Sequence, residues 1–140
     1  MIVDPSAVIA VLAQEEDAAV FGAALVDSGS STMSAACYVE CGIVLDRHPS
    51  SKASWNLDQF LLESRIAIAS FTPEQARIAR MAYRDFGRGS GHPARLNFGD
   101  CFAYALAVES NQPLLYKGDD FGHTDVRSAL DQVRSPARPG

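Results

Sequence analysis

The sequence has few cysteines, no long apolar run and no excess of positive charge, and each absence excludes a class of protein. Cys37, Cys41 and Cys101 are the only cysteines among the 140 residues, and none forms a CxxC pair. A disulfide framework is therefore not expected. A reducing, cytoplasmic location is expected instead. No apolar stretch approaches the roughly 20 residues of a transmembrane helix, and the start of the chain lacks a basic signal region, so no membrane attachment is expected.

The composition is that of an ordinary soluble domain. Hydrophobic residues make up 47% of the chain and charged residues 21%, which excludes a disordered chain or a coiled-coil rod. A chain of this length can bury a sizeable core without disulfides or metals. The net charge of −5 argues against a protein that simply coats nucleic acid.

Alternating apolar and helical patterns predict one α/β domain over residues 1–133, followed by a disordered tail over 134–140. Strands are expected near 2–4, 31–33, 66–69, 113–116 and 126, and helices over 7–13, 17–26, 35–47, 51–63, 73–86 and 100–110. This order requires crossover connections and therefore a mostly parallel sheet.

Several side chains have predicted local roles. Ser6, Ser34 and Thr72 are expected to cap helices. Residues expected to be mainly in the core, by helical spacing, are Trp55, Phe60, Leu61, Tyr83, Phe86, Phe98, Phe102 and Tyr104. Stacking of the last five on a nucleic-acid base is a lesser alternative.

Acidic residues interrupt or directly follow apolar runs at four places. They are Asp4 after the first strand, Glu40 as the only charge within 35–45, Asp100 at a helix start, and the pair Asp119–Asp120 after the strand at 113–116. Turn formation, helix capping or surface exposure would explain each one alone. A parallel sheet, however, would bring them together at one edge.

Carboxylates crowded in one cleft need a cation, because mutual repulsion raises their pKa values. Oxygen ligands favour Mg²⁺ or Mn²⁺, and such sites commonly act on phosphate. A zinc site or a serine nucleophile is less well supported, because the three histidines are scattered and no GxSxG motif occurs. The glycine-rich segment 87–91 lacks the ending of a phosphate-binding P-loop.

Arginines gather in one part of the chain, at Arg77, Arg80, Arg84 and Arg88. The first three are spaced to share a helix face, and guanidinium groups suit phosphate contacts. A solvated helix face is the alternative.

Four motifs in fixed order resemble the PIN-domain ribonuclease toxins of VapBC toxin–antitoxin systems over residues 1–133. They are Met-Ile-Val-Asp-Pro-Ser-Ala at the start, the helical Glu40, Asn-Phe-Gly-Asp-Cys-Phe-Ala-Tyr from position 97, and Leu-Leu-Tyr-Lys-Gly-Asp-Asp-Phe from position 114. The resemblance implies a three-layer α/β/α fold with a central, mostly parallel sheet of four to five strands. It also implies an RNA endonuclease of a type II system, a Mg²⁺ or Mn²⁺ cofactor, a VapB-type antitoxin partner and a toxin homodimer.

By position, the resemblance assigns Asp4, Glu40 and Asp100 as catalytic metal ligands. The fourth acid matches loosely; Asp119 is favoured over Asp120, because Phe121 is expected to be buried beside a capping Asp120. Pro5 departs from the family, which usually has a hydroxyl residue there. A catalytically weak or inactive module that binds antitoxin or RNA is therefore the alternative, and a small phosphatase is a second.

Overall fold

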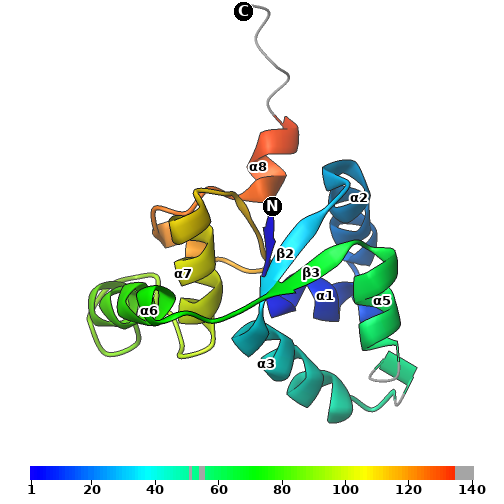
Figure 1. The fold of residues 1–140 in the computed structure, drawn as a ribbon, viewed down its shortest axis with the longest axis horizontal. Helices are drawn as coiled ribbons and strands as arrows, with labels where there is room; N and C mark the ends of the chain where they lie inside the picture. The colour runs from blue at the N-terminus through cyan, green and yellow to red at the C-terminus, as the bar shows by residue number, and fades with distance from the viewer. Residues whose placement is uncertain (51, 54–55, 135–140) are drawn as a thin grey trace, which may run out of the picture.

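The computed structural model describes residues 1–50, 52–53 and 56–134, which form a parallel sheet flanked by helices (Figure 1). The sheet has four strands in the order β3-β2-β1-β4. They are β1 (Ile2–Val3), β2 (Ser31–Ser34), β3 (Ile66–Ala69) and β4 (Leu114–Leu115), all paired in parallel. The predicted α/β/α class and parallel sheet are confirmed.

Helices follow the strands as crossovers. Their bounds are α1 (Pro5–Leu12), α2 (Ala18–Ser28), α3 (Ala35–Asp46), α5 (Leu57–Glu63), α6 (Pro73–Phe86), α7 (Asp100–Ser110) and α8 (Ala129–Arg134), with a 3₁₀ turn η1 (Asp120–His123). In Figure 1, α6 and α7 lie to the left of the strands and α1, α2 and α5 to the right, while α3 extends below them. No helix in the described ranges is long and apolar enough to cross a membrane.

The core lies between the sheet and its helices. Ile2 and Val3 of β1 and Leu114 and Leu115 of β4 are fully buried, as expected for strands covered on both faces. Helix α7 is buried along most of its length, and its many alanines let it pack closely against the sheet and α6. All three cysteines are buried and free.

Local predictions at three helix starts had different outcomes. Thr72 caps α6 as expected, its Oγ1 accepting from the backbone N–H of Gln75. Ser6 does not cap the first helix: Asp4 occupies that position, and α1 begins at Pro5, where a missing N–H costs nothing. Ser34 sits at the N-cap of α3, but its side chain makes no capping hydrogen bond.

Other differences are small. The helix expected over 17–26 extends farther, since α2 continues through Ser28 and has Gly29 as its C-cap, whose φ of 75° suits glycine. The strand expected near 126 is only an isolated bridge between Leu114 and Ser128. In the helix expected at 51–63, Leu61 is buried, and residues 51 and 54–55, including Trp55, lie outside the described residues.

Two aromatic predictions were wrong. Tyr83 and Phe98 are exposed, with 43% and 75% of their surface accessible, whereas Tyr104 is buried and Phe86 and Phe102 are partly buried. Phe98 lies in the irregular segment before α7, so helical spacing did not apply to it.

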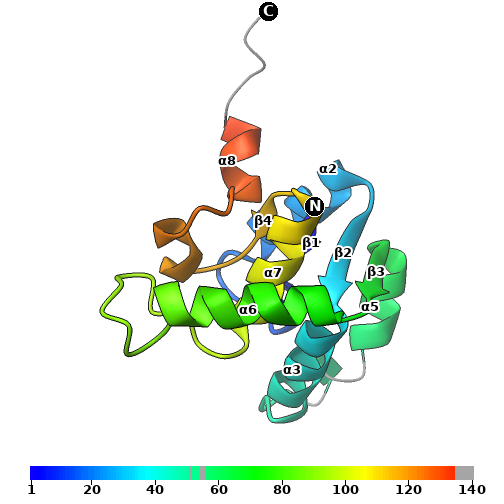
Figure 2. The same cartoon turned by 60° about the vertical axis from the view of Figure 1, so that its left-hand side comes forward.

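The parallel arrangement brings the ends of the strands together. The carboxyl ends of β1 and β2 lead directly into α1 and α3, and in register Ile2 pairs with Thr32, which places Asp4 level with Ser34. In Figures 1 and 2, the start of α7 lies at this same end, and the N-terminus and α8 lie at the other end. Candidate ligands at strand ends therefore share one edge of the sheet.

Candidate active site

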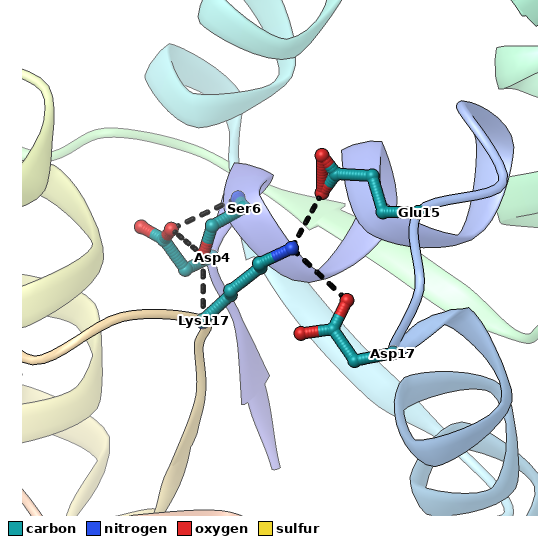
Figure 3. Close-up of polar contacts among 5 residues, drawn as sticks. All are labelled: Asp4, Ser6, Glu15, Asp17 and Lys117. Carbon is teal, nitrogen blue, oxygen red and sulfur yellow. Dashed lines mark hydrogen bonds and ion pairs between the residues drawn. The ribbon is translucent and has the colours of Figure 1, made fainter.

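Asp4 is fixed by a chain of hydrogen bonds through Ser6. Asp4 is 5% exposed, and its Oδ2 accepts from the Ser6 backbone N–H at 3.0 Å and from Ser6 Oγ at 2.5 Å. Ser6 Oγ in turn accepts from the backbone N–H of Lys117 at 2.9 Å, so its proton points to Asp4 (Figure 3). The sequence identified Ser6 as a cap; instead it positions the acid.

The loop that carries Lys117 is itself held in place. Lys117 Nζ lies 3.1 Å from Glu15 Oε1 and 3.0 Å from Asp17 Oδ1, in the connection between α1 and α2 (Figure 3). The ammonium group therefore points to these acids, while the backbone of the same residue supports Ser6 and, through it, Asp4.

Glu40 reaches toward the start of α7 from α3. Its carboxylate lies directly against Gly99: a Cβ at position 99 would come within 2.6 Å of Oε1. Because Gly99 has no side chain, there is space for the Glu40 carboxylate against its backbone. Neither Gly99 nor Asn97 was identified as functional from the sequence.

Asp100 is fixed by a reciprocal pair of hydrogen bonds with Asn97. The Asn97 backbone N–H donates to Asp100 Oδ2 at 3.0 Å, and the Asp100 N–H donates to Asn97 Oδ1 at 2.8 Å. The reciprocal bonds resemble those of a capping box but precede the helix, because the N-cap of α7 is Gly99.

The three acids lie in one another's electrostatic field. Burial raises the pKa of Asp4 to about 7, although the bonds from Ser6 oppose the shift; the charges of Asp100 and Glu40 raise it further. Burial also raises the pKa of Glu40, with a further contribution from Asp100. These side chains come from three separate elements, and together they form a partly buried cluster of negative charge.

The chemistry of this cluster fits a divalent cation. Asp4 and Asp100 each use Oδ2 for their positioning bonds, and Oδ1 of each makes no hydrogen bond with the described residues. Ser34 Oγ, level with Asp4 on the next strand, is buried and also has no hydrogen-bond partner there. Within that same part of the chain, no three acid, histidine or cysteine side chains already converge as metal ligands. Acids that do not converge closely can still hold Mg²⁺ through water molecules, which this ion commonly retains.

Asp119 and Asp120 differ in their relation to the cluster. Asp119 occupies the N-cap position of η1, where its backbone carbonyl accepts from the Gly122 N–H and its side chain makes no capping hydrogen bond. The charge of Asp120 raises the pKa of Asp100, after the larger effect of burial. Phe121 is buried, as expected.

The arginines form an exposed surface beside the cluster. Arg77, Arg80 and Arg84 line one depression on α6, which confirms that they share a face. Arg77 pairs with Glu74 at 3.3 Å and Arg84 with Asp85 at 2.8 Å, both in exposed positions where ion pairs are weak. Arg88 lies farther along the chain, and its charge lowers the pKa of Asp100.

Comparison with known proteins agrees with this architecture. The family model for the PIN domain matches residues 1–127. Ribonuclease VapC28 of Mycobacterium tuberculosis is 54% identical over 132 residues, covering 94% of this chain and 99% of that protein. Ribonuclease VapC42 of the same species is 48% identical over 129 residues, covering 92% and 98%. The crystal structure of VapC20 from M. tuberculosis, described as a sarcin-ricin loop cleaving toxin, superposes with a TM-score of 0.71 at 16% identity, covering 89% of this chain and 95% of that one.

A parallel sheet with acids at its carboxyl edge and the matching family model define a PIN domain. The chain belongs to the PIN-domain family and, within it, to the VapC ribonucleases. These are hydrolases that act on RNA, and PIN-domain ribonucleases of this kind generally depend on divalent metal ions.

Proposed function

We propose that this chain is the toxin of a type II toxin–antitoxin system and cleaves RNA internally with the help of Mg²⁺ or Mn²⁺. Asp4, Glu40 and Asp100 would hold the ion directly or through its waters, and Asp119 or Asp120 would supply a fourth acid. The observation that carries the proposal is that three acids from separate elements, Asp4, Glu40 and Asp100, lie at one edge of the sheet, where burial and their mutual charges raise their pKa values. A shared cation would relieve the repulsion and desolvation that raise them.

When bound, the ion supplies a water of lowered pKa and neutralises charge on the scissile phosphate. The protein's own groups prepare the site for this chemistry. Ser6 and Asn97 lock the two aspartates through Oδ2, which leaves Oδ1 of each for the ion or its waters. Gly99 leaves room for the Glu40 carboxylate. The acids are therefore oriented before substrate arrives, so little reorganisation is needed.

Pro5 does not weaken this proposal. It lies at the first position of α1, where no backbone N–H is needed, and Asp4 is held by Ser6 rather than by residue 5. The inactive-module alternative thus loses its main support. The similarity to curated ribonucleases also argues against a phosphatase.

Arg77, Arg80, Arg84 and Arg88 would bind RNA phosphates beside the acids. The exposed pairs with Glu74 and Asp85 are weak enough for phosphates to displace. Replacing Arg77, Arg80 and Arg84 by Gln should raise the apparent KM and flatten its dependence on salt concentration. An unchanged salt slope would show that this face does not contact RNA.

The direct test is metal-dependent cleavage of total RNA, with mapping of the new 5′ ends. We expect discrete cuts with Mg²⁺ or Mn²⁺, none with EDTA, and none for Asp100→Asn. p-Nitrophenyl phosphate should not be hydrolysed. Cleavage by Asp100→Asn at the wild-type rate, or cleavage that persists in EDTA, would refute the metal assignment.

The family assignment extends the proposal to a protein partner, an oligomeric state and a cellular location. A VapB-type antitoxin would cover the acidic cleft, and two copies of the toxin would form a homodimer in the cytoplasm, where three free, buried thiols stay reduced. Sedimentation of the purified chain tests the dimer, because a mass of one chain at micromolar concentration would contradict it. Co-expression with a cognate antitoxin should abolish cleavage.

A further inference from the structure

An exposed aromatic ring separates two hollows beside the acidic cluster. Phe98, 75% exposed, directly precedes Gly99 and Asp100. One hollow has Glu40, Val39 and Ile43 among its lining residues and the other has Arg80, Tyr83 and Phe71, while Phe98 and Phe102 line both. The ring is therefore a ridge with a carboxylate on one side and a guanidinium on the other.

Neighbouring rings support Phe98 from below. Its ring meets that of Phe102 edge to face, with centroids 4.8 Å apart and planes at 85°. Phe102 meets Phe71 in the same way, at 4.8 Å and 83°. This relay holds Phe98 in place although most of its surface is free. A single exposed apolar side chain is ordinary on a protein surface. A binding role for Phe98 must therefore be argued from the charged residues around it.

The charges around the ridge form a continuous path. Glu40 lines the first hollow, Arg80 the second, and Arg80 also lines the arginine depression with Arg77 and Arg84. The second hollow has a volume of about 460 Å³, within the range of sites that hold small organic groups. A ligand along this path meets acids suited to a metal, then an aromatic face, then cations.

We propose that an unpaired base of the RNA substrate stacks on Phe98, with its flanking phosphates directed to the metal site on one side and to Arg80 on the other. A nucleic-acid strand is the polymer that offers phosphate, aromatic base and phosphate in this order. The proposal rests on the RNA-cleaving function proposed above and adds a residue, Phe98, that positions the substrate.

Stacking on Phe98 requires an unpaired base, so the contribution of Phe98 to binding should differ between single-stranded and duplex RNA. A base within a duplex has both faces covered by its neighbours and must be unstacked before it can lie on Phe98. Every base has an aromatic face, so stacking on Phe98 should depend on whether the base is unpaired and only weakly on which base it is.

The test measures binding in EDTA, where no cleavage occurs, by fluorescence anisotropy of a labelled single-stranded oligoribonucleotide. Phe98→Ala should weaken binding about 5- to 100-fold, Phe98→Leu should also lose affinity, and Phe98→Trp should retain it. The salt dependence should stay unchanged in these variants, whereas Arg80→Gln should reduce the salt slope by about one. Leu62→Ala is the matched control, since Leu62 is 73% exposed on α5 and lines neither hollow.

Two further RNAs sharpen the result. A duplex of the same sequence should bind wild type and Phe98→Ala equally. A single abasic nucleotide next to the mapped cut should weaken binding to wild type but add nothing to the loss in Phe98→Ala, because both changes remove the same contact.

The outcomes separate this inference from the function on which it depends. Wild-type binding by Phe98→Ala, or equal losses on single-stranded and duplex RNA, would overturn the stacking proposal while metal-dependent cleavage still stands. Loss of antitoxin binding alone in Phe98→Ala would identify the ridge as a protein contact and also overturn it. Failure of the wild type to cleave any RNA with Mg²⁺ or Mn²⁺ would refute the proposed function itself.

Discussion

The carboxylate of Glu40 occupies the space that a side chain on residue 99 would need. A Cβ on residue 99 would lie 2.6 Å from Oε1 and 2.7 Å from Cδ of Glu40. The backbone at Gly99, with φ −64° and ψ −38°, is ordinary for any residue. Glycine is therefore required here for space, and the group it accommodates is a predicted metal ligand.

Gly99→Ala should displace Glu40 and leave the fold intact. The obstructing atoms are the end of a flexible side chain, so Glu40 can rotate away without backbone movement. We expect cleavage to fall about 100-fold, as for a ligand misplaced by about 1 Å, with the melting temperature nearly unchanged. Cleavage rate and thermal unfolding of the same preparation check this.

Gly22→Ala is the matched control for that variant. A Cβ at Gly22, within α2, would meet no atom within 4 Å. The change should raise the free energy of unfolding by about 0.5–1 kcal/mol and leave cleavage unchanged. Normal cleavage by Gly99→Ala would show that the position of Glu40 is not critical.

Asp4 should make the metal-free protein less stable as the pH rises. Its pKa is about 7 in the folded chain against an ordinary value of 3.8 for an exposed aspartate, so the folded state binds more protons between these values. The free energy of unfolding therefore falls from about pH 4 to about pH 7 and levels off above. Below pH 4 the acid is protonated in both states, and this contribution to stability is fully present.

Urea unfolding in EDTA at pH 5 and pH 8 tests this contribution. The Asp4→Asn variant should remain folded and lose cleavage, and its free energy of unfolding should decrease less between pH 5 and pH 8. At pH 8 it should unfold at the same or higher urea concentration than wild type. Mn²⁺ should stabilise wild type more at pH 8 than at pH 5, because the ion competes with the proton. A stability of wild type that rises between these pH values in EDTA would contradict the assignment.

Ser6→Ala should weaken both the site and the loop that supports it. The change removes the hydroxyl that donates to Asp4 and accepts from the Lys117 N–H. We expect a loss of about 1–2 kcal/mol in the free energy of unfolding. The pKa of Asp4 should rise further, so that Mn²⁺ binding needs a higher pH. Ser6→Thr keeps the hydroxyl and should restore the pH dependence of binding, measured by calorimetry; failure of this rescue would show that the hydroxyl is not the cause.

Much of the site followed from the sequence because its acids stand at recognisable boundaries. Asp4 ends a buried strand and Asp100 opens a helix, and the parallel order of the strands brings such positions to one edge. The fold could also be predicted from the sequence, because few topologies are possible for alternating strands and helices.

The supporting contacts did not follow, because they join residues distant in sequence or depend on empty space. The bond from Lys117 to Ser6 spans 111 positions, and nothing in the local pattern of either residue indicates it. The fit of Glu40 against Gly99 depends on how α3 and α7 cross. The exposure of Phe98 depends on the irregular segment before α7, where periodicity gives no information.

The choice between Asp119 and Asp120 as the fourth acid stays a prediction. The sequence favours Asp119 because Asp120 is expected to cap the following turn, but the N-cap position of η1 is that of Asp119, whose side chain makes no capping hydrogen bond. The charge of Asp120 acts on Asp100 and raises its pKa. We therefore predict that Asp120→Asn weakens Mn²⁺ binding and slows cleavage, while Asp119→Asn, the same change of charge one residue away, leaves both near wild type.

Calorimetric titration with Mn²⁺ and initial cleavage rates decide between the two aspartates. Loss of a positioned carboxylate from the ligand shell should cost about 10- to 100-fold in metal affinity. Asp120→Asn should also lower the pKa of Asp100 by removing the neighbouring charge, so the pH dependence of residual Mn²⁺ binding should shift to lower pH. The opposite pattern would assign the fourth position to Asp119. Unchanged affinity and rate in both variants would mean that Asp4, Glu40 and Asp100 suffice.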